Sequence, residues 1–283
     1  MEISYTSKLF SLKHCLRYNL SIQASLNGFS FCVYDSTRNT YLLLKYFPIA
    51  VNNNQEYYLK HLGEIIKKEE VLRHKFRKVN FVYFSSDSII IPKELSKEDD
   101  LKDYLGFQQE VNEYDEIHYK TVEQLNSTVI YSIPSAITNI FLNLYDSIAY
   151  TNQVNLLLRI ANDIIKNKSL SEFCLINKNE SFFDIVVFKN GKLQLHNTFN
   201  YVTENDLVYY SLSTLKSLGL ADSNCPVYYS GRFRAKGQDT LMLNKFIKVF
   251  VANEPVQIAK MNNIEMFKMY PIHFFAPLYF LNY

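Results

Sequence analysis

This chain of 283 residues has few cysteines and a small net charge, and both features argue against several kinds of protein. The four cysteines, Cys15, Cys32, Cys174 and Cys225, are widely spaced and form no C-x-x-C pair. This usage argues against a zinc site and for reduced thiols that serve as small buried hydrophobes. The formal net charge is only +2. A charge this small argues against a nucleic acid or a membrane surface as the partner.

Several sequence motifs are missing as well. The chain has no phosphate-binding P-loop, no nucleophile elbow and no dinucleotide-binding glycine fingerprint. Its first stretch carries scattered basic residues without an apolar core, so we expect no secretory signal. The densest apolar stretch, Phe274 to Leu281, is short and contains Pro277, so it cannot span a bilayer as a helix. We therefore expect a cytoplasmic protein.

The chain does have enough apolar sequence for two domain cores. Hydrophobic residues make up 48% and charged residues 20%, which is typical of a globular protein and not of a disordered one. Tyrosine is abundant, at 22 residues, and tryptophan is absent. Tyrosines could stack on the bases of a single-stranded nucleic acid, but the chain has no basic stripe. We therefore interpret them as residues that fill the sheets and their margins.

The clearest local signal is a β-hairpin in the second half. Asn190-Gly191 separates two apolar runs, Phe182 to Lys189 and Lys192 to Tyr201. This pair favours a type I′ turn, because both residues accept a positive φ at little cost. The second run alternates apolar and polar residues, which predicts a half-buried strand. His196 falls on the polar side of this alternation, so we expect its side chain to be exposed.

A helix is predicted directly after the hairpin. Thr203, with Asp206 three residues later, resembles a capping box, and Gly219 can end the helix in a left-handed conformation. A short apolar run, Glu172 to Asn177, precedes the hairpin, and another, Pro226 to Ser230, follows the helix. The predicted order is β-β-β-α-β.

The same order is predicted in the N-terminal third. Its elements are the alternating run Leu20 to Leu26, the turn Asn27-Gly28, the runs Phe29 to Asp35 and Tyr41 to Phe47, the helical stripe Tyr58 to Ile66, and the run Val79 to Phe84. The two units start at Leu20 and Glu172, 152 residues apart. We interpret this as an internal duplication, against the alternative of a coincidental α/β alternation.

The duplication predicts two lobes, residues 1–150 and 151–283. No Gly/Ser linker separates them, so we expect them to be closely joined. A charged insertion, residues 92–120, interrupts the first lobe. Its acidic run, Glu110 to Glu116, is interpreted as a charged loop, with paired carboxylates for acid/base chemistry as the alternative. The aromatic tail, Met269 to Tyr283, is predicted to be a strand or docked segment covering the second sheet, or else a partner-binding patch.

Three segments resemble a known protein family. They are Leu20 to Phe31, Tyr104 to Phe107 and Val129 to Pro134. They are similar to an uncharacterised family of the Bacteroidetes that is known only as a domain of unknown function. The resemblance implies an actin-like ATPase (ribonuclease H-like) fold of class α/β, with two lobes, which sugar kinases and the Hsp70 nucleotide domain share. This agrees with the duplicated order read from the sequence.

The resemblance also implies a place for ATP and Mg²⁺. Active members of the fold hold phosphate at the first hairpin turn of each lobe, and the first turn carries Asp-x-Gly. This chain has Asn27 and Gly28 at the first turn and Lys178-Asn179-Glu180-Ser181, without glycine, at the second. The adenosine position would be Tyr229-Ser230-Gly231, followed by Arg232, with one glycine where the pattern has two.

These departures predict a vestigial nucleotide site. Each hydrogen bond to a charged group contributes about 1.5–3 kcal/mol, so losing both turn carboxylates weakens the binding of a metal-bound phosphate by about 3–6 kcal/mol. We therefore expect a non-catalytic pseudo-ATPase without a cofactor, whose partner is another protein. The alternative is an ATP-binding enzyme that uses Arg232 or Glu180 as a non-standard ligand. The basic residues Arg232, Arg234 and Lys236 motivate that alternative, because they could neutralise phosphate charge, whereas the simpler interpretation of these residues is a solvated loop.

Overall fold

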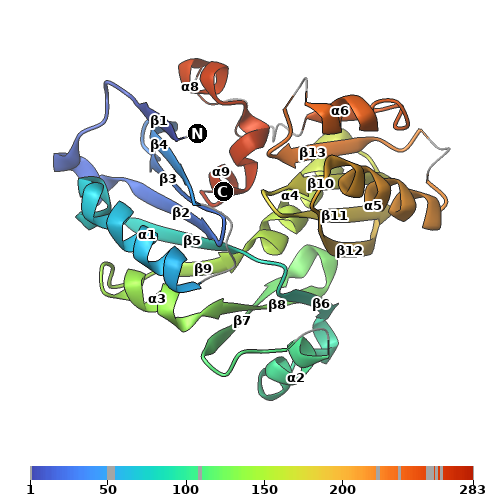
Figure 1. The fold of residues 1–283 in the computed structure, drawn as a ribbon, viewed down its shortest axis with the longest axis horizontal. Coiled ribbons are helices and arrows are strands. Elements are labelled where there is room, and N and C mark those ends of the chain that lie inside the picture. Colours follow the sequence, from blue (N-terminus) through green and yellow to red (C-terminus); the bar gives the residue numbers. More distant parts are fainter. Residues whose placement is uncertain are drawn as a thin grey trace. The chain divides into compact units, whose positions relative to one another are not determined.

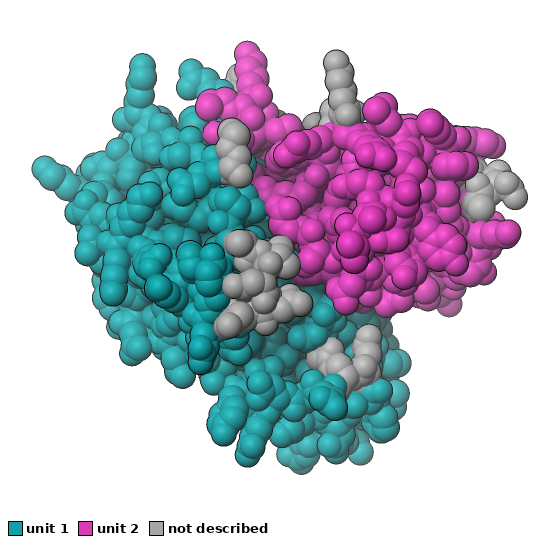
Figure 2. All heavy atoms as spheres, viewed as in Figure 1, with its two compact units in different colours: residues 1–156, 261–266, 278–283 teal, residues 157–260, 267–277 magenta. Residues whose placement is uncertain are grey.

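The computed structural model describes residues 2–49, 55–107, 110–220, 224–234, 237–252, 258, 261 and 264–282. The chain divides into two compact units, which Figure 2 colours separately. Unit 1 comprises residues 1–156, 261–266 and 278–283, and unit 2 comprises residues 157–260 and 267–277. This division differs from the predicted lobes, 1–150 and 151–283, because the C-terminal segment contributes residues to both units.

Unit 1 is built on a six-stranded sheet with the order β1-β4-β3-β2-β5-β9 (Figure 1). Its elements are β1 (Ile3–Thr6), β2 (Asn19–Ser25), β3 (Gly28–Asp35), β4 (Thr40–Pro48), α1 (Gln55–Lys68), β5 (Lys78–Phe84), α3 (Ser135–Leu142) and β9 (Ala149–Asn152). Buried rings join α3 to the sheet. The ring of Phe141 lies 4.9 Å from that of Phe81 and 6.1 Å from that of Phe29. Burying rings of this size is a large part of what stabilises such a core.

A second, three-stranded sheet of unit 1 has the order β6-β8-β7. It consists of β6 (Ser88–Pro92), β7 (Asp115–Val122) and β8 (Ser127–Pro134), and the helix α2 (Leu101–Gly106) packs on it. The contact is apolar, because Leu101 and Leu105 meet Ile91 and Ile130. The charged insertion predicted at residues 92–120 therefore contributes α2 and most of β7 to this small sheet.

Unit 2 is built on a five-stranded sheet with the order β12-β11-β10-β13-β14. Its elements are β10 (Phe173–Lys178), β11 (Phe182–Lys189), β12 (Lys192–Asn200), α5 (Glu204–Ser217), β13 (Val227–Gly231), α6 (Gln238–Leu243) and β14 (Phe250–Ala252). The helix α4 (Gln153–Lys168) begins in unit 1 and ends in unit 2. Helices α5 and α6 cover one face of the sheet, where residues such as Leu207 and Leu243 pack against Ile176 and Ile185.

The two larger sheets repeat one another strand by strand. In unit 1, β2 pairs antiparallel with β3 and parallel with β5, and in unit 2, β10 pairs antiparallel with β11 and parallel with β13. The pair Leu20↔Val33 recurs as Cys174↔Val187, each 154 residues further on. The ladder irregularity that follows Val33 recurs after Val187. A matching bulge is a local feature that chance alternation does not produce, so the sheets support the predicted duplication.

The hairpin turns differ between the units. Asn190 and Gly191 have φ values of 54° and 70°, as the predicted type I′ turn requires. In unit 1 the turn residues are Leu26 and Asn27, because Gly28 already pairs with Ser25 in the ladder. Neither Asn27 nor Gly28 has a positive φ. The first Asn-Gly pair therefore does not form the turn that the second one forms.

The predicted helix after the hairpin is confirmed as α5. The Thr203 side chain accepts a hydrogen bond from the backbone of Asp206, and the Asp206 carboxylate accepts one from the backbone of Thr203 at 2.8 Å. This is the capping box that the sequence predicts. At the other end, Gly219 has a φ of 71°, and the Leu220 amide donates to the Leu215 carbonyl at 2.7 Å. Residues close in the sequence therefore provide hydrogen-bond partners for backbone groups at both ends of α5.

The C-terminal segment is helical, so the predicted final strand is wrong. It forms α8 (Ile264–Met269), a 3₁₀ turn (Ile272–Phe275) and α9 (Ala276–Phe280). Within unit 2, the His273 imidazole lies 3.0 Å from the Phe233 carbonyl oxygen. Within unit 1, the Tyr41 hydroxyl donates to the Tyr279 carbonyl at 2.7 Å. The tail therefore has contacts in both units, and not only in the unit that contains the second sheet.

All four cysteines are free and buried, as predicted. Burial raises the pKa of the Cys15 thiol and that of Cys225 to about 11, and raises the pKa of Cys32 and Cys174 further. Within the part of the chain that the structure describes, no helix combines the length and the apolar character that crossing a membrane requires.

Candidate functional site

The predicted site residues of unit 2 meet where β10 and β13 end. The parallel ladder pairs Asn177 with Ser230 and Lys178 with Gly231, and the Arg232 amide donates to the Lys178 carbonyl at 2.8 Å. Gly231 has a φ of +79°, and a Cβ atom there would lie 2.1 Å from the Lys178 carbonyl oxygen. Only glycine fits this approach of the two strand ends.

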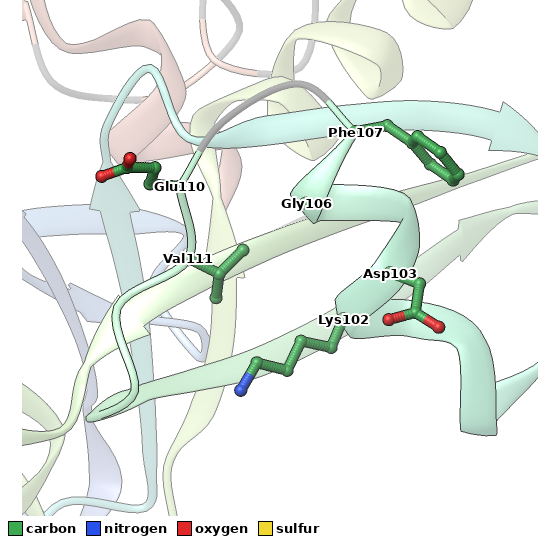
Figure 3. Close-up of a pocket in the computed structure, with 6 residues that line it drawn as sticks. All are labelled: Lys102, Asp103, Gly106, Phe107, Glu110 and Val111. Atoms are coloured by element: carbon green, nitrogen blue, oxygen red, sulfur yellow. The ribbon is translucent and has the colours of Figure 1, made fainter.

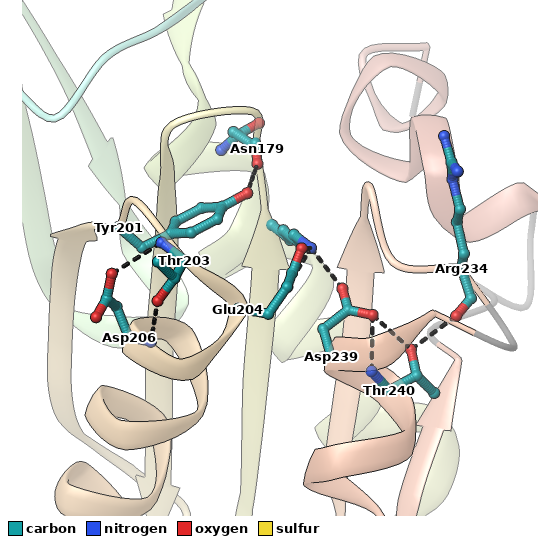
Figure 4. Close-up of polar contacts among 9 residues, drawn as sticks. Asn179, Tyr201, Thr203, Glu204, Asp206, Arg234, Asp239 and Thr240 are labelled. Atoms are coloured by element: carbon teal, nitrogen blue, oxygen red, sulfur yellow. Dashed lines mark hydrogen bonds and ion pairs between the residues drawn. The ribbon is translucent and has the colours of Figure 1, made fainter.

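The side chain of Lys178 is buried in an ion-pair cluster at this strand end. Its Nζ atom lies 2.8 Å from both carboxylate oxygens of Glu204 and 2.5 Å from Oδ2 of Asp239. The side chains of Lys178 and Asp239 are only 7% and 4% exposed, whereas that of Glu204 is 34% exposed. The helix α5 supplies Glu204 from its first turn, and α6 supplies Asp239 from its start (Figure 4). The ammonium group is therefore neutralised inside unit 2.

Aromatic rings enclose the same ammonium group. The Nζ atom of Lys178 lies 5.6 Å from the ring centroids of Tyr201 and Phe233. The Tyr201 hydroxyl donates to the Asn179 carbonyl at 2.6 Å, which ties the ring to the turn after β10 (Figure 4). Burial, and then the nearby carboxylates of Glu204, Glu180 and Asp239, raise the pKa of Tyr201. This tyrosine therefore stays protonated and acts as a donor.

Asp239 also organises the start of α6. Its Oδ1 atom accepts a hydrogen bond from the Thr240 amide at 2.7 Å, and the Thr240 hydroxyl donates to the Arg234 carbonyl at 2.8 Å. Only the backbone of Arg234 takes part in this contact, and its side chain is exposed (Figure 4). Lys236, the third residue of the predicted basic cluster, lies outside the described residues.

Arg232 has partners within unit 2. Its Nε atom lies 3.5 Å from Oε1 of Glu180, and its guanidinium lies 5.0 Å from the ring centroid of Phe275. Glu180 is the only carboxylate of the turn Lys178-Asn179-Glu180-Ser181. The two residues that sequence reasoning offered as non-standard phosphate or metal ligands, Arg232 and Glu180, therefore pair with each other.

Ser230 lies on the opposite side of the sheet from Lys178. It is fully buried, and its hydroxyl donates to the Asn177 side-chain oxygen at 2.9 Å. Asn177 in turn donates to Asp184 at 3.4 Å, and the His196 ring lies 3.7 Å from the Asp184 carboxylate. The His196 side chain is only 7% exposed, so the prediction of an exposed histidine is wrong. The reason is that both faces of this sheet are covered, so the polar side of the alternation is also inside.

Asn27 and Gly28 belong to unit 1, at the hairpin between β2 and β3. Asn27 is 7% exposed, and its carbonyl accepts a hydrogen bond from the Ile49 amide at 3.2 Å. A Cβ atom on Gly28 would lie 2.8 Å from the ring of Tyr46. The glycine of the first turn is therefore explained by the packing of a tyrosine ring over it.

The part of the chain that the structure describes contains no evident metal site. Among the described residues, no group of three or more His, Cys, Asp or Glu side chains could hold a metal ion. The acidic side chains nearest the second turn, Glu180, Glu204 and Asp239, each face a cationic side chain of unit 2.

Comparison with known proteins gives the family. Residues 7–250 match the family described as "Protein of unknown function (DUF3822)". The chain belongs to this family. No curated protein matches the chain in sequence. The description of the family assigns no activity to these residues.

Solved structures show the fold of this DUF3822 member. A Bacteroides thetaiotaomicron protein, described as having an actin-like ATPase fold and unknown function, is 22% identical with a TM-score of 0.77. The match covers 92% of this chain and 98% of that one. A structure described as a PilM–PilN type IV pilus biogenesis complex is 10% identical with a TM-score of 0.64, covering 93% and 97% of the two chains. The predicted actin-like ATPase fold is thus confirmed.

Sequence reasoning missed the two carboxylates that hold Lys178. Glu204 has a partial signal, because it follows the capping residue Thr203, but an acidic residue in a first helical turn is usually explained by the helix dipole. Asp239 lies 61 residues from Lys178 along the chain, and nothing in the local sequence links them. Only the parallel pairing of β10 with β13 brings the start of α6 to this strand end.

Proposed function

We propose that this DUF3822 member is a non-catalytic binding protein on a degenerate actin-like fold, and that its partner is another protein. One observation carries the proposal. The two cationic side chains that are next to the second turn, Lys178 and Arg232, are neutralised by carboxylates of the same unit. A bound triphosphate would have to compete with Glu204, Asp239 and Glu180 for both of them.

The residues of the two turns do not fit a metal-bound phosphate. The turn of unit 1 presents Asn27, which carries no charge, and its glycine lies under the ring of Tyr46. The turn of unit 2 has no glycine, and its only carboxylate pairs with Arg232. Two missing carboxylate contacts lower affinity by about two to four powers of ten. A site of micromolar affinity would then approach millimolar affinity.

The class of partner is supported by one structural relative. The similar structure described as a PilM–PilN complex is an assembly of proteins, which shows that a chain of this fold occurs in a protein complex. The net charge of +2 gives no support to a nucleic acid or a membrane as the partner.

A second candidate is an ATP-binding enzyme with non-standard phosphate ligands. The exposed side chain of Arg234 favours it, because this arginine follows the adenosine position that the family resemblance implies. Its charge alone would replace only part of the affinity that the missing carboxylates supplied.

Capture of the partner tests the proposal. The tagged chain would be immobilised and exposed to an extract of its own source cells, with and without millimolar MgATP, and the retained proteins would be identified by mass spectrometry. We expect one defined protein to be retained equally under both conditions and to be absent from bare resin. Retention that appears or disappears with MgATP would contradict a nucleotide-independent binding role.

A further inference from the structure

The two larger sheets differ at one edge. The strands β4, β3, β2 and β5 of unit 1 match β12, β11, β10 and β13 of unit 2 in order and direction. In unit 1, the outer edge of β4 is paired antiparallel with β1. In unit 2, β12 is the outer strand of the sheet (Figure 1), and no strand among the described residues pairs with its outer edge.

The register identifies the part of β12 that corresponds to the edge under β1. Leu43 and Leu195 pair with matching valines of β3 and β11. The strand β1 pairs with residues 43–46 of β4. Their counterparts in unit 2 are therefore residues 195–198.

The backbone groups of β12 that point outward are those of His196 and Thr198. The Tyr201 amide donates to the Ser181 carbonyl at 3.0 Å, on the side of β11. Because successive residues of an antiparallel strand direct their N–H and C=O groups to opposite sides, those of His196 and Thr198 face the outer edge. The Thr198 amide donates to the side-chain oxygen of its neighbour Asn197 at 2.9 Å. A carbonyl of an added strand can replace this local acceptor.

Solvent exposure follows the difference between the two edges. Leu43, Leu44 and Tyr46, next to β1, are at most 6% exposed, whereas residues 195–198 are all partly exposed. Folded proteins usually protect a long edge strand with proline, charge or a bulge. The nine residues of β12 include no proline, their one lysine is Lys192 at the start, and their one ladder irregularity lies before residues 195–198. The sequence of this edge therefore does little to prevent pairing with another strand.

The two faces of this edge have different chemistry. Leu195 and Phe199 pack against the core under α5 and stay partly exposed, and the ring of Phe199 stacks on that of Tyr210 at 4.9 Å. His196 and Thr198 point to the other face, where both lie within 3.7 Å of a buried carboxylate. An added strand would meet apolar groups on one face and polar groups on the other, as an alternating sequence requires.

Charge distinguishes between possible occupants. Unit 2 has fourteen basic and nine acidic residues, a net charge of +5. A segment antiparallel to β12 would run from Thr198 toward the exposed Lys192, where an acidic residue is complementary. A second copy that paired through its own β12 would bring two positive units together, which like-charge repulsion disfavours.

A hollow beside α2 offers no comparable site. It is lined by Lys102, Asp103, Gly106, Phe107, Glu110 and Val111 (Figure 3). The side chains of Phe107 and Asp103 point away from Val111 and Glu110, so they do not converge on one group of a ligand.

We propose that the outer edge of β12 binds an extended segment of the partner protein, which adds antiparallel to residues 195–198 as β1 adds to β4. The inference rests on the proposed function as a protein-binding module. The segment alternates apolar and polar residues, has no proline in its paired stretch and is neutral or acidic. Main-chain hydrogen bonds provide its affinity, and side chains on the two faces provide its specificity.

Peptide binding tests the proposal. The probe is a fluorescein-labelled peptide in which valine and threonine alternate between two terminal glutamates. One counterpart has methyl groups on its central backbone nitrogens, which removes main-chain donors but keeps the side chains and the charge. A second counterpart has lysine at both ends. With the full chain, fluorescence anisotropy should show saturable binding of the probe below millimolar concentration. We expect at least about tenfold weaker binding of the methylated peptide and at least about fivefold weaker binding of the lysine peptide.

Hydrogen exchange locates the bound peptide. Mass spectrometry should show slower exchange of the β12 amides, residues 192–200, when the probe is bound. The strand at the opposite end of the sheet, β14, is the internal control, and exchange of its residues 250–252 should not change.

Two variants of equal charge separate a local effect from a general one. N197E places a negative charge on the β12 edge, and S213E places the same charge on an exposed position of α5. We expect N197E to bind the probe at least about tenfold more weakly and S213E to bind it within about twofold of the original chain. N197A removes the local acceptor of the Thr198 amide, so it should bind the probe as tightly as the original chain or more tightly. Neither substituted side chain is buried, so circular dichroism should show unchanged folding.

Several results would overturn the proposal: no saturable binding, equal binding of either counterpart, equal weakening by N197E and S213E, or protection of another segment. A dimer in which residues 192–200 are protected without peptide would also overturn it, because a second copy would then be the occupant. If N197E retains an ATP-independent partner as well as the original chain does, the edge site is wrong and the proposed function stands. If partner capture requires MgATP while the peptide results hold, the proposed function is wrong and the edge site stands.

Discussion

The carbonyl oxygen of Lys178 lies 2.1 Å from the position that a Cβ atom on Gly231 would occupy. This approach joins the ends of β10 and β13, and it holds the side chain of Lys178 between Glu204 and Asp239. Gly231, which the family resemblance places at the adenosine position, is therefore also required by the strand pairing of unit 2. Its presence alone does not indicate a ligand.

Replacing Gly231 with alanine should destabilise the protein. The φ of +79° is unfavourable for any residue with a Cβ atom, and the contact with a backbone carbonyl cannot be relieved by a side-chain rotation. We expect a loss of at least about 2 kcal/mol in the free energy of unfolding, measured by urea denaturation. Gly63 is the matched control, because it lies in α1 with no atom within 4 Å of its Cβ position. Gly63→Ala should be neutral or stabilising, and equal stability of the two variants would refute this account of Gly231.

Replacing Lys178 with methionine should leave an uncompensated buried charge. Asp239 is 4% exposed and loses its only cationic partner among the described residues. Removing one member of a buried ion pair costs about 3–5 kcal/mol, and restoring neutrality recovers part of it. The double variant K178M/D239N should therefore be less destabilised than the sum of its single variants in a double-mutant cycle. Lys216→Met, an exposed lysine of α5, should change stability by no more than about 0.5 kcal/mol. Additive single effects would argue against a coupled cluster.

The four cysteine thiols should be unreactive in the folded protein. All are buried, and burial raises the pKa of each, to about 11 for Cys15 and Cys225. At pH 8 these groups are protonated and shielded, so a thiol reagent such as Ellman's reagent should react only after denaturant is added. A native-state thiol that reacts within seconds would show that one of these sites opens or is activated.

Much of the fold was readable from the sequence because its signals are local. The hairpin at Asn190-Gly191 and the capping box at Thr203 are each specified by residues within a few positions of one another, and the structure has both. The duplication was visible as a recurring order of elements, although the offset is 154 residues where the pattern predicted 152. A short apolar run predicts that a strand exists more reliably than it predicts the residues at which the strand begins and ends.

The candidate site was less predictable because its contacts are distant in the chain. Lys178 is the last residue of β10, at the start of the predicted second turn, and its partners Glu204 and Asp239 are 26 and 61 residues away in the sequence. The prediction that His196 is exposed is wrong, because an alternating pattern does not reveal whether the second face of a sheet is also covered. The helical tail was missed because aromatic residues such as Phe274 and Phe275 suit a strand as well as a helix.

The central claim is that the two turns no longer bind a metal-bound nucleotide. Isothermal titration calorimetry of the purified chain with MgATP tests it most directly. We predict no saturable heat with MgATP or MgADP at concentrations up to the millimolar range, and no shift of the melting temperature. Saturable binding with a micromolar Kd, together with ATP hydrolysis by the same preparation, would contradict it.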